Sequence, residues 1–224
     1  MGVTEVVADL PLSGRIAMVT GAAQGVGRAC AIALARAGCF VAACDEDGGA
    51  VESLDETALL CERESGRANA FTANVTNPDE VERLWVEVTA ALGAPIVLVN
   101  GVGASPPKPL GETSPTEWQA DVRAHLDAAF YCARAVLPAM RAAGFGRILN
   151  VARLPTGEAL VALARTLAEE ERENGITVNA VVAGHVRPDE IGRVVAFLAS
   201  PASESITGAR ILVGRVQKPQ EAKA

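Results

Sequence analysis

Short runs of apolar residues alternate along the chain with longer segments in which apolar residues recur every three or four positions. The short runs predict buried strands, and the longer segments predict amphipathic helices. Strands are expected at residues 16–19, 40–44, 68–72, 96–100, 147–151, 177–182 and 210–213. Helices are expected from the first strand to residue 37 and at 49–63, 77–92, 115–143, 157–173 and 189–199. This alternation predicts an α/β fold with one doubly wound parallel β-sheet and helices on both faces.

Two helix starts share one pattern, an N-cap residue followed by a proline and then a glutamate. Residues 77–80 read Asn-Pro-Asp-Glu, and residues 114–117 read Ser-Pro-Thr-Glu. Each pattern predicts a capping box, in which the glutamate accepts a hydrogen bond from the backbone of the cap residue. A single domain, residues 13–215, is expected between a loose leader at 1–12 and a polar tail at 216–224.

Composition and charge narrow the range of functions. Apolar residues make up 50% of the 224 residues and aromatic residues only 4%, which indicates a core of Ala, Val and Leu. The net charge of −7 disfavours nucleic acid and anionic membranes, because no basic stripe is available for phosphates. No apolar run is long enough to span a bilayer and the N-terminus lacks a signal pattern, so a cytoplasmic protein is expected. The cysteines have no metal-ligand spacing and predict buried, reduced thiols, with no metal site.

A glycine-rich turn follows the first strand, where residues 20–27 read TGAAQGVG and open a helix. Gly21 would permit a tight turn, Gly25 would let the backbone approach a pyrophosphate, and Gly27 would let the helix pack closely. The start of the helix would present free N–H groups and a partial positive charge to the phosphates. This pattern predicts a dinucleotide-binding turn.

Acidic residues follow the second strand. Asp45 comes 18 residues after Gly27, a place from which a carboxylate accepts hydrogen bonds from the adenosine ribose. Glu46 and Asp47 come next, so a ribose 2′-phosphate would meet three negative charges and no arginine. If a dinucleotide binds, NAD is therefore favoured over NADP. The alternative interpretation is a solvated acidic turn that follows a strand.

Motifs along nearly the whole chain resemble the short-chain dehydrogenase/reductase family. They lie at residues 12–21 (opening strand and TGxxxGxG turn), 74–75 (Asn-Val for Asp-Val), 100–103 (NGVG for NNAG), 146–151 (GRILNV), 177–181 (TVNAV) and 206–208 (ITG). The resemblance implies a Rossmann fold and NAD binding. It places the cofactor contacts at Thr20, Gly21, Gln24, Gly25, Val26, Gly27, Asp45, Asn74, Val75, Asn100 and Gly101.

The same resemblance implies a chemistry whose residues are missing from this sequence. Members of the family use a tyrosine as proton donor or acceptor, a lysine four residues later, a serine and a helix asparagine. Arg153 and Gly157 fall at the tyrosine and lysine positions, and the segment that carries the serine has no counterpart. The substrate lid after the sixth strand is also missing. The single tyrosine is Tyr131, and no lysine lies between Lys108 and Lys218.

A few residues are candidates for a role at this end of the site. His125 stands at the asparagine position and could act as an acid or base, although a structural role is favoured. Arg153 cannot shuttle protons at neutral pH and is interpreted as a surface, interface or anion-binding residue. Tyr131 is interpreted as core or interface, and Lys108 as a solvated charge. His125 and Arg153 remain weak catalytic candidates.

These departures favour a catalytically silent subunit that pairs with an active paralogue in a hetero-oligomer. The resemblance implies association through helices 115–143 and 157–173, where apolar and small residues recur at helical spacing. Two alternatives stay open. One is an NAD-dependent oxidoreductase with reassigned groups, such as His125 with Arg153. The other is a non-enzymatic NAD-binding regulatory module.

Overall fold

The computed structural model of the protein describes residues 10–46, 51–101, 109–152, 157–184 and 186–214. Seven parallel strands form one sheet in the order β3-β2-β1-β4-β5-β6-β7. The strands are β1 Ile16–Thr20, β2 Phe40–Asp45, β3 Ala68–Thr72, β4 Val97–Asn100, β5 Gly146–Ala152, β6 Ile176–Ala183 and β7 Arg210–Val213. The predicted strands are thus confirmed to within one residue at each end.

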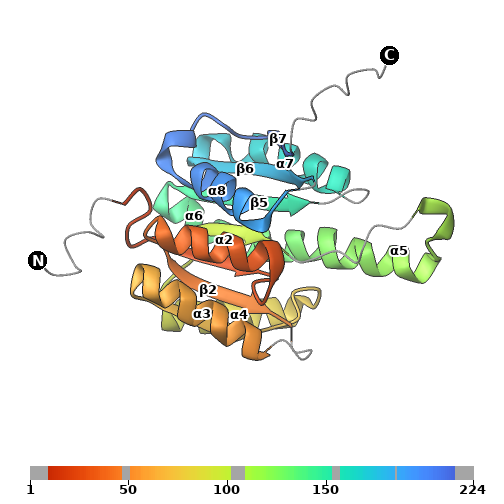
Figure 1. Ribbon diagram of the computed structural model, residues 1–224. Helices are drawn as coiled ribbons and strands as arrows, with labels where there is room; N and C mark the ends of the chain where they lie inside the picture. Colours follow the sequence, from red (N-terminus) through yellow and green to blue (C-terminus); the bar gives the residue numbers. More distant parts are fainter. Residues whose placement is uncertain (1–9, 47–50, 102–108, 153–156, 185, 215–224) are drawn as a thin grey trace, which may run out of the picture.

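Helices cover both faces of the sheet, with α2, α3 and α8 on one face and α4, α6 and α7 on the other (Figure 1). The α-helices are α2 Gly25–Arg36, α3 Val51–Ser65, α4 Pro78–Ala91, α5 Pro115–Val122, α6 Ala128–Ala143, α7 Gly157–Glu170 and α8 Pro188–Ala199. The short segments are η1 Leu110–Glu112, η2 Arg123–Asp127, η3 Arg172–Asn174 and η4 Pro201–Ser203. The predicted doubly wound α/β fold is confirmed. No helix in the described ranges is long and apolar enough to cross a membrane.

The core consists of two apolar clusters, one on each face of the sheet. Leu34 of α2 and Leu198 of α8 belong to the first cluster, and Leu84 of α4 and Met140 of α6 belong to the second. Burying one such side chain contributes about 1.5–3 kcal/mol. Leu12, the last residue of the predicted leader, is fully buried in the first cluster.

The predicted burial of the five cysteines is confirmed, and all are free thiols. Burial raises the pKa of the thiols of Cys30, Cys39, Cys61 and Cys132 to about 12. Because the thiolate is the reactive form, these side chains are chemically inert core residues at neutral pH.

The predicted helix at 115–143 is continuous but not uniform. Between α5 and α6 the backbone widens into the π-helical segment η2. Such segments are rare and often occur at functional sites. The α5 helix buries none of its residues and extends away from the sheet (Figure 1).

The two predicted capping boxes have different outcomes. The box at α5 is confirmed: Ser114 Oγ accepts from the Glu117 N–H at 3.2 Å, and the Glu117 carboxylate accepts from the Ser114 N–H at 2.9 Å. At α4 the Asn77 side chain accepts from the Asp79 N–H at 3.0 Å. The Glu80 carboxylate, however, accepts from the Asn74 N–H at 2.8 Å. The second half of that predicted box is therefore wrong, because the preceding loop brings another backbone donor to the glutamate.

A buried carboxylate joins the ends of α6 and α7. The Glu171 side chain is fully buried, whereas that of Arg141 is half exposed. Arg141 Nε donates to Glu171 Oε2 at 3.0 Å, and Asn174 Nδ2 donates to the same oxygen at 2.9 Å. The hydrogen bond from Arg141 lowers the pKa of Glu171, and burial opposes this shift.

Candidate functional site

A cleft of about 670 Å³ lies at the carboxyl ends of the strands. It opens where the chain order reverses between β1 and β4, the position at which doubly wound sheets bind ligands. The cleft brings together all the residues predicted to contact a cofactor except Asn100. These lining residues are Thr20, Gly21, Gln24, Gly25, Val26, Gly27, Asp45, Asn74, Val75 and Gly101.

The glycines of the turn are required by its geometry. Gly21 and Gly25 have positive φ angles of 65° and 57°, which other residues rarely adopt. A Cβ atom added at Gly27 would lie 1.9 Å from the Gly21 carbonyl oxygen. A Cβ atom at Gly101 would lie 2.7 Å from the carbonyl oxygen of Thr20. The structure therefore supports the predicted roles of Gly21 in the turn and of Gly27 in close packing.

The start of α2 faces this turn without a side-chain cap. Gln24 is the N-cap residue and makes no capping hydrogen bond. The first N–H groups of a helix have no partner within the helix, and they attract anions together with the helix dipole. This arrangement fits the pyrophosphate of a dinucleotide.

Arg28, which the sequence interpretation overlooked, holds the turn in place. Its guanidinium donates to the Ala23 carbonyl at 2.7 and 3.0 Å, to the Ser53 carbonyl at 2.8 Å and to Glu56 at 2.9 Å. These bonds fasten the turn to α3. Because four of its five N–H donors are already used within the protein, Arg28 is a structural clamp.

Asp45 is joined to the same turn. Its Oδ2 accepts from the Ala23 N–H at 2.9 Å, and its Oδ1 accepts from the Glu46 N–H at 2.9 Å. A carboxylate oxygen accepts more than one hydrogen bond, so both atoms can still receive ribose hydroxyl groups. Asp45 is thus preorganised and faces the cleft together with Glu46. Asp47 lies outside the described residues.

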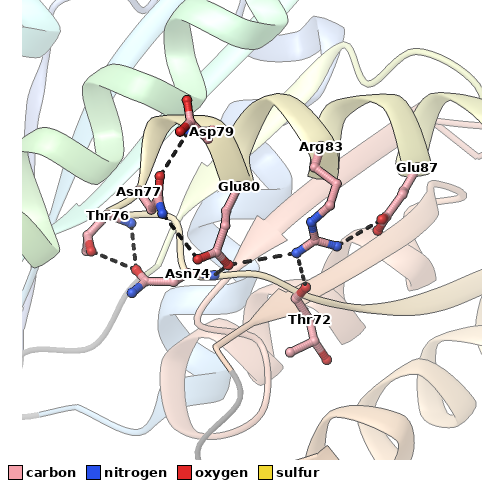
Figure 2. A network of polar contacts seen from close by, with 8 residues as sticks. All are labelled: Thr72, Asn74, Thr76, Asn77, Asp79, Glu80, Arg83 and Glu87. Atoms are coloured by element: carbon pink, nitrogen blue, oxygen red, sulfur yellow. Dashed lines mark hydrogen bonds and ion pairs between the residues drawn. The ribbon is translucent and has the colours of Figure 1, made fainter.

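A polar network orients Asn74 at the same side of the cleft (Figure 2). Asn74 Oδ1 accepts from the Thr76 N–H at 2.9 Å and from the Thr76 hydroxyl at 2.7 Å. A backbone N–H can only donate, which identifies the atom facing it as the oxygen. The amide nitrogen therefore points away from the network, as Figure 2 shows.

Asn100 lies behind the cleft. Its Nδ2 donates to Asn150 Oδ1 at 2.8 Å, and both side chains are buried. The two residues face each other in the register of β4 and β5. Next to them, the Gly101 N–H donates to Thr20 Oγ1 at 3.1 Å. The side chain of Asn100 thus clamps two strands and does not line the cleft.

The other end of the cleft is apolar and tightly connected. Val151, Ala183, Val186 and Ile191 line it. The Val186 N–H donates to the Gly184 carbonyl at 2.9 Å in a tight turn between β6 and α8. Val151 ends the GRILNV motif, but no motif marked Ala183, Val186 or Ile191, because small apolar side chains in a strand, turn or helix carry no distinctive sequence signal.

The connection from β5 to α7 spans residues 153–156, which lie outside the described residues, so Arg153 is not placed. Gly157, which the resemblance predicts at the lysine position, is buried as the first residue of α7. A Cβ atom at Gly157 would meet the Cβ of Ala152 at 3.0 Å. This position is therefore crowded for any side chain.

His125 is the histidine that lines the cleft within the described residues. It lies in η2, is 5% exposed, and its Nδ1 lies 2.8 Å from the Asp121 carbonyl oxygen. Ala120, Asp121 and Ala124 line the cleft beside it and were not predicted from the sequence. These residues lie at the end of α5 and in the π-helical segment η2, and periodicity alone gives no signal of such a segment.

Tyr131 lies away from the cleft. It packs partly buried against the core, and its ring makes an edge contact with Phe130 at 5.7 Å between centroids. The interpretation of Tyr131 as core or interface is therefore supported. Lys108 lies outside the described residues.

Residues 15–154 match the sequence profile of a family described as short chain dehydrogenase. The acetoacetyl-CoA reductase of Allochromatium vinosum is 30% identical over 239 aligned positions, covering 89% of this chain and 96% of the relative. A 3-oxoacyl-[acyl-carrier-protein] reductase of a Synechocystis species is 30% identical over 236 positions, with coverage of 88% and 94%.

Solved structures agree with these sequence similarities. A protein of Sinorhizobium meliloti 1021, described as a short-chain alcohol dehydrogenase, has a TM-score of 0.82 and 31% identity. The similarity covers 91% of this chain and 96% of that one. The seven-stranded sheet and its flanking helices thus match a fold seen in experimental structures.

Proposed function

Because this chain belongs to the short-chain dehydrogenase family, a family of NAD(P)-dependent oxidoreductases, we propose that it is a catalytically silent subunit. In this proposal the chain binds NAD in the cleft and assembles with an active paralogue of the same family. The observation that carries the proposal is the short connection from β5 to α7. Only residues 153–156 lie between these elements, and they include neither a tyrosine nor a lysine.

The chemistry of the cleft supports a silent subunit. The ionisable side chains that line it, among the described residues, are those of Asp45, Glu46, Asp121 and His125. Positioned acid–base groups contribute about 10² to 10⁴ in rate. Asp45 and Glu46 lie on the side proposed for adenosine, which leaves Asp121 and His125 for the reacting end. A reacting carbonyl would therefore meet no tyrosine–lysine pair among the described lining residues.

The comparison with relatives points the same way. The alignment with the acetoacetyl-CoA reductase has 239 positions, more than the 224 residues of this chain. That relative therefore contains segments without a counterpart here. The profile match also ends at residue 154, within the short connection between β5 and α7.

NAD is proposed over NADP because of the charges around the adenosine ribose. Asp45 and Glu46 both line the cleft, and Arg28 is occupied by protein acceptors. A 2′-phosphate at this position would face two carboxylates. Titration with both dinucleotides, followed by the shift in unfolding temperature, tests this because ligand binding stabilises the native state.

The partner surface is proposed on α5, α6 and α7. Trp118 on α5 and Phe130 on α6 are 44% and 49% exposed, although both are large and apolar. Exposed aromatic side chains are common at the centres of protein interfaces. A second polypeptide of the same family would cover this surface.

Native mass spectrometry after co-expression with an active paralogue tests the assembly. We expect a mixed oligomer that is weakened in Phe130→Ser. The control is Leu59→Ser, because Leu59 is similarly exposed at 54% but lies on α3. A chain that remains monomeric with every paralogue offered would contradict the partner proposal.

The second candidate function is an active NAD-dependent oxidoreductase. It is favoured by the reductase relatives and by the presence of His125 in the cleft. Oxidation of NADH by the purified chain with acetoacetyl-CoA separates the two functions. We expect no turnover above background, and turnover that is abolished in His125→Ala would establish the second candidate.

A further inference from the structure

The tautomer of the histidine in the π-helical segment is set by its own helix. His125 Nδ1 lies 2.8 Å from the carbonyl oxygen of Asp121, four residues earlier. A carbonyl oxygen can only accept a hydrogen bond, so Nδ1 must carry the proton. In the neutral ring, Nε2 is then an acceptor.

This acceptor has no partner in the described part of the chain. The only hydrogen bond of the His125 ring there is the one made by Nδ1. The hydroxyl oxygens of Thr89 and Thr177 are fully buried and have no hydrogen-bond partner, and Nε2 of His125 differs from them because it is not fully buried. The side chain is nevertheless 5% exposed and lines the cleft. Its open side therefore faces the cleft.

The position of His125 Nε2 in the cleft is that expected for the second ribose of a bound dinucleotide. In the proposed function, Asp45 at the end of β2 contacts the adenosine ribose, and the turn after β1 contacts the pyrophosphate. Continuing along the sheet order, Gly101 follows β4 and Val151 belongs to β5. The η2 segment contacts α7, which follows β5. A ligand that extends from Asp45 across the turn would thus bring its second ribose to the side of His125.

We propose that His125 Nε2 accepts a hydrogen bond from a hydroxyl group of this second ribose. The proposal rests on dinucleotide binding as set out above. It names the ligand class more closely, as ADP-ribosyl compounds with or without a nicotinamide ring. Apart from the helix face that carries His125 and Asp121, the lining at this end offers apolar side chains to the ring, those of Val151, Ala183, Val186 and Ile191.

Calorimetric titration with NAD, ADP-ribose and ADP tests this proposal. ADP lacks the second ribose, so it should bind more weakly than ADP-ribose, and NAD should bind about as well as ADP-ribose. In His125→Phe the Kd for ADP-ribose should rise about fivefold to tenfold, the effect of one hydrogen bond. The Kd for ADP should not change. Tyr131→Phe is the matched control, because Tyr131 does not line the cleft.

Each other outcome has a clear meaning. If ADP-ribose and ADP bind equally well to the unmodified chain, or if His125→Phe weakens both equally, the proposal is overturned while dinucleotide binding stands. If none of the three compounds binds, the proposed function fails as well.

A measurement on the unmodified chain covers the case in which His125→Phe does not fold. Nitrogen NMR of the imidazole should show the proton on Nδ1. The Nε2 resonance should shift when ADP-ribose is added and stay unchanged with ADP. A proton on Nε2, or no shift with ADP-ribose, would refute the assignment.

Discussion

The two ends of the cleft are built in different ways. At the end proposed to hold adenosine, here called the adenosine end, backbone and side-chain hydrogen bonds fix each group: Asp45 is bonded to Ala23, Arg28 clamps the glycine-rich turn, and Asn74 is held by Thr76. At the other end, apolar side chains line the cleft near the short connections from β5 to α7 and from β6 to α8. The polar exception there is the helix face that carries His125 and Asp121.

In the proposed function, this difference separates binding from chemistry within one cleft. Hydrogen bonds that preorganise a site lower the cost of binding, because the groups are ordered before the ligand arrives. Catalysis needs further groups that act on the reacting atoms. The fold can thus keep the first property when the second is absent. The following experiments test this separation, starting with the largest expected effect.

Gly27→Ala should disrupt the adenosine end most strongly. The added Cβ would lie 1.9 Å from the Gly21 carbonyl oxygen, so helix and turn must separate. We expect a loss of about 3 kcal/mol in the free energy of unfolding and no thermal shift with NAD. Chemical denaturation with and without NAD measures both. Gly111→Ala is the control, because a Cβ there has nothing within 4 Å. Equal behaviour of the two variants would show that the turn is adaptable.

Asp45→Ala should weaken NAD binding with a smaller effect on folding. The variant removes both acceptors that face the ribose and the bond to the Ala23 N–H. We expect the Kd for NAD to rise about 10- to 100-fold, the range for hydrogen bonds to a charged group. Calorimetry measures the change, with the exposed Glu62→Ala on the neighbouring helix as control. An unchanged Kd would mean that the adenosine end does not recognise the ribose.

Glu171→Gln should loosen the connection between the ends of α6 and α7. Because the folded-state pKa of Glu171 is lowered, its carboxylate stabilises the fold above the usual glutamate pKa. That contribution is lost as the pH falls through the lowered value. We expect a loss of about 1–2 kcal/mol at pH 7 that shrinks toward zero in strong acid. Urea unfolding at several pH values measures it. A difference independent of pH would exclude the charge as its cause.

Restoring two residues should not restore chemistry. Arg153→Tyr combined with Gly157→Lys introduces a tyrosine and a lysine at the positions that the resemblance implies, but a Cβ at Gly157 meets the Cβ of Ala152 at 3.0 Å. We expect NADH oxidation to stay at background and the free energy of unfolding to fall by about 1 kcal/mol. Arg153→Tyr alone is the control. Turnover in the double variant would show that the two ends differ by these residues only.

The strands and most helices could be predicted because their burial follows simple periods. Every strand agreed to within one residue, since parallel strands covered on both faces form continuous apolar runs. The π-helical segment could not be predicted, because the sequence around it keeps the regular amphipathic pattern of an α-helix. The role of Glu80 also depended on the folded loop before α4, which brings the Asn74 N–H to it.

The candidate site could be predicted where a sequence motif is tied to a known local backbone geometry. The glycine-rich turn and Asp45 come from such motifs, and the structure gathers them in one cleft. Thr76, Val186 and the cleft-lining face of α5 carry no motif and reach the cleft through tertiary packing alone. Asn100 shows the limit of motif reasoning, because strand pairing with Asn150 directs its side chain elsewhere.

The exposed α5 helix has a consequence for slow dynamics. It comprises eight residues, buries none of them, and is held mainly by its capping box and by the helix that continues it. The end of a helix that buries no side chain opens locally at a low cost in free energy. Its amide hydrogens should therefore exchange with solvent much faster than those of the central strands. A molecule that binds to α5 would slow the exchange of its amide hydrogens, so this exchange rate can be used to detect association.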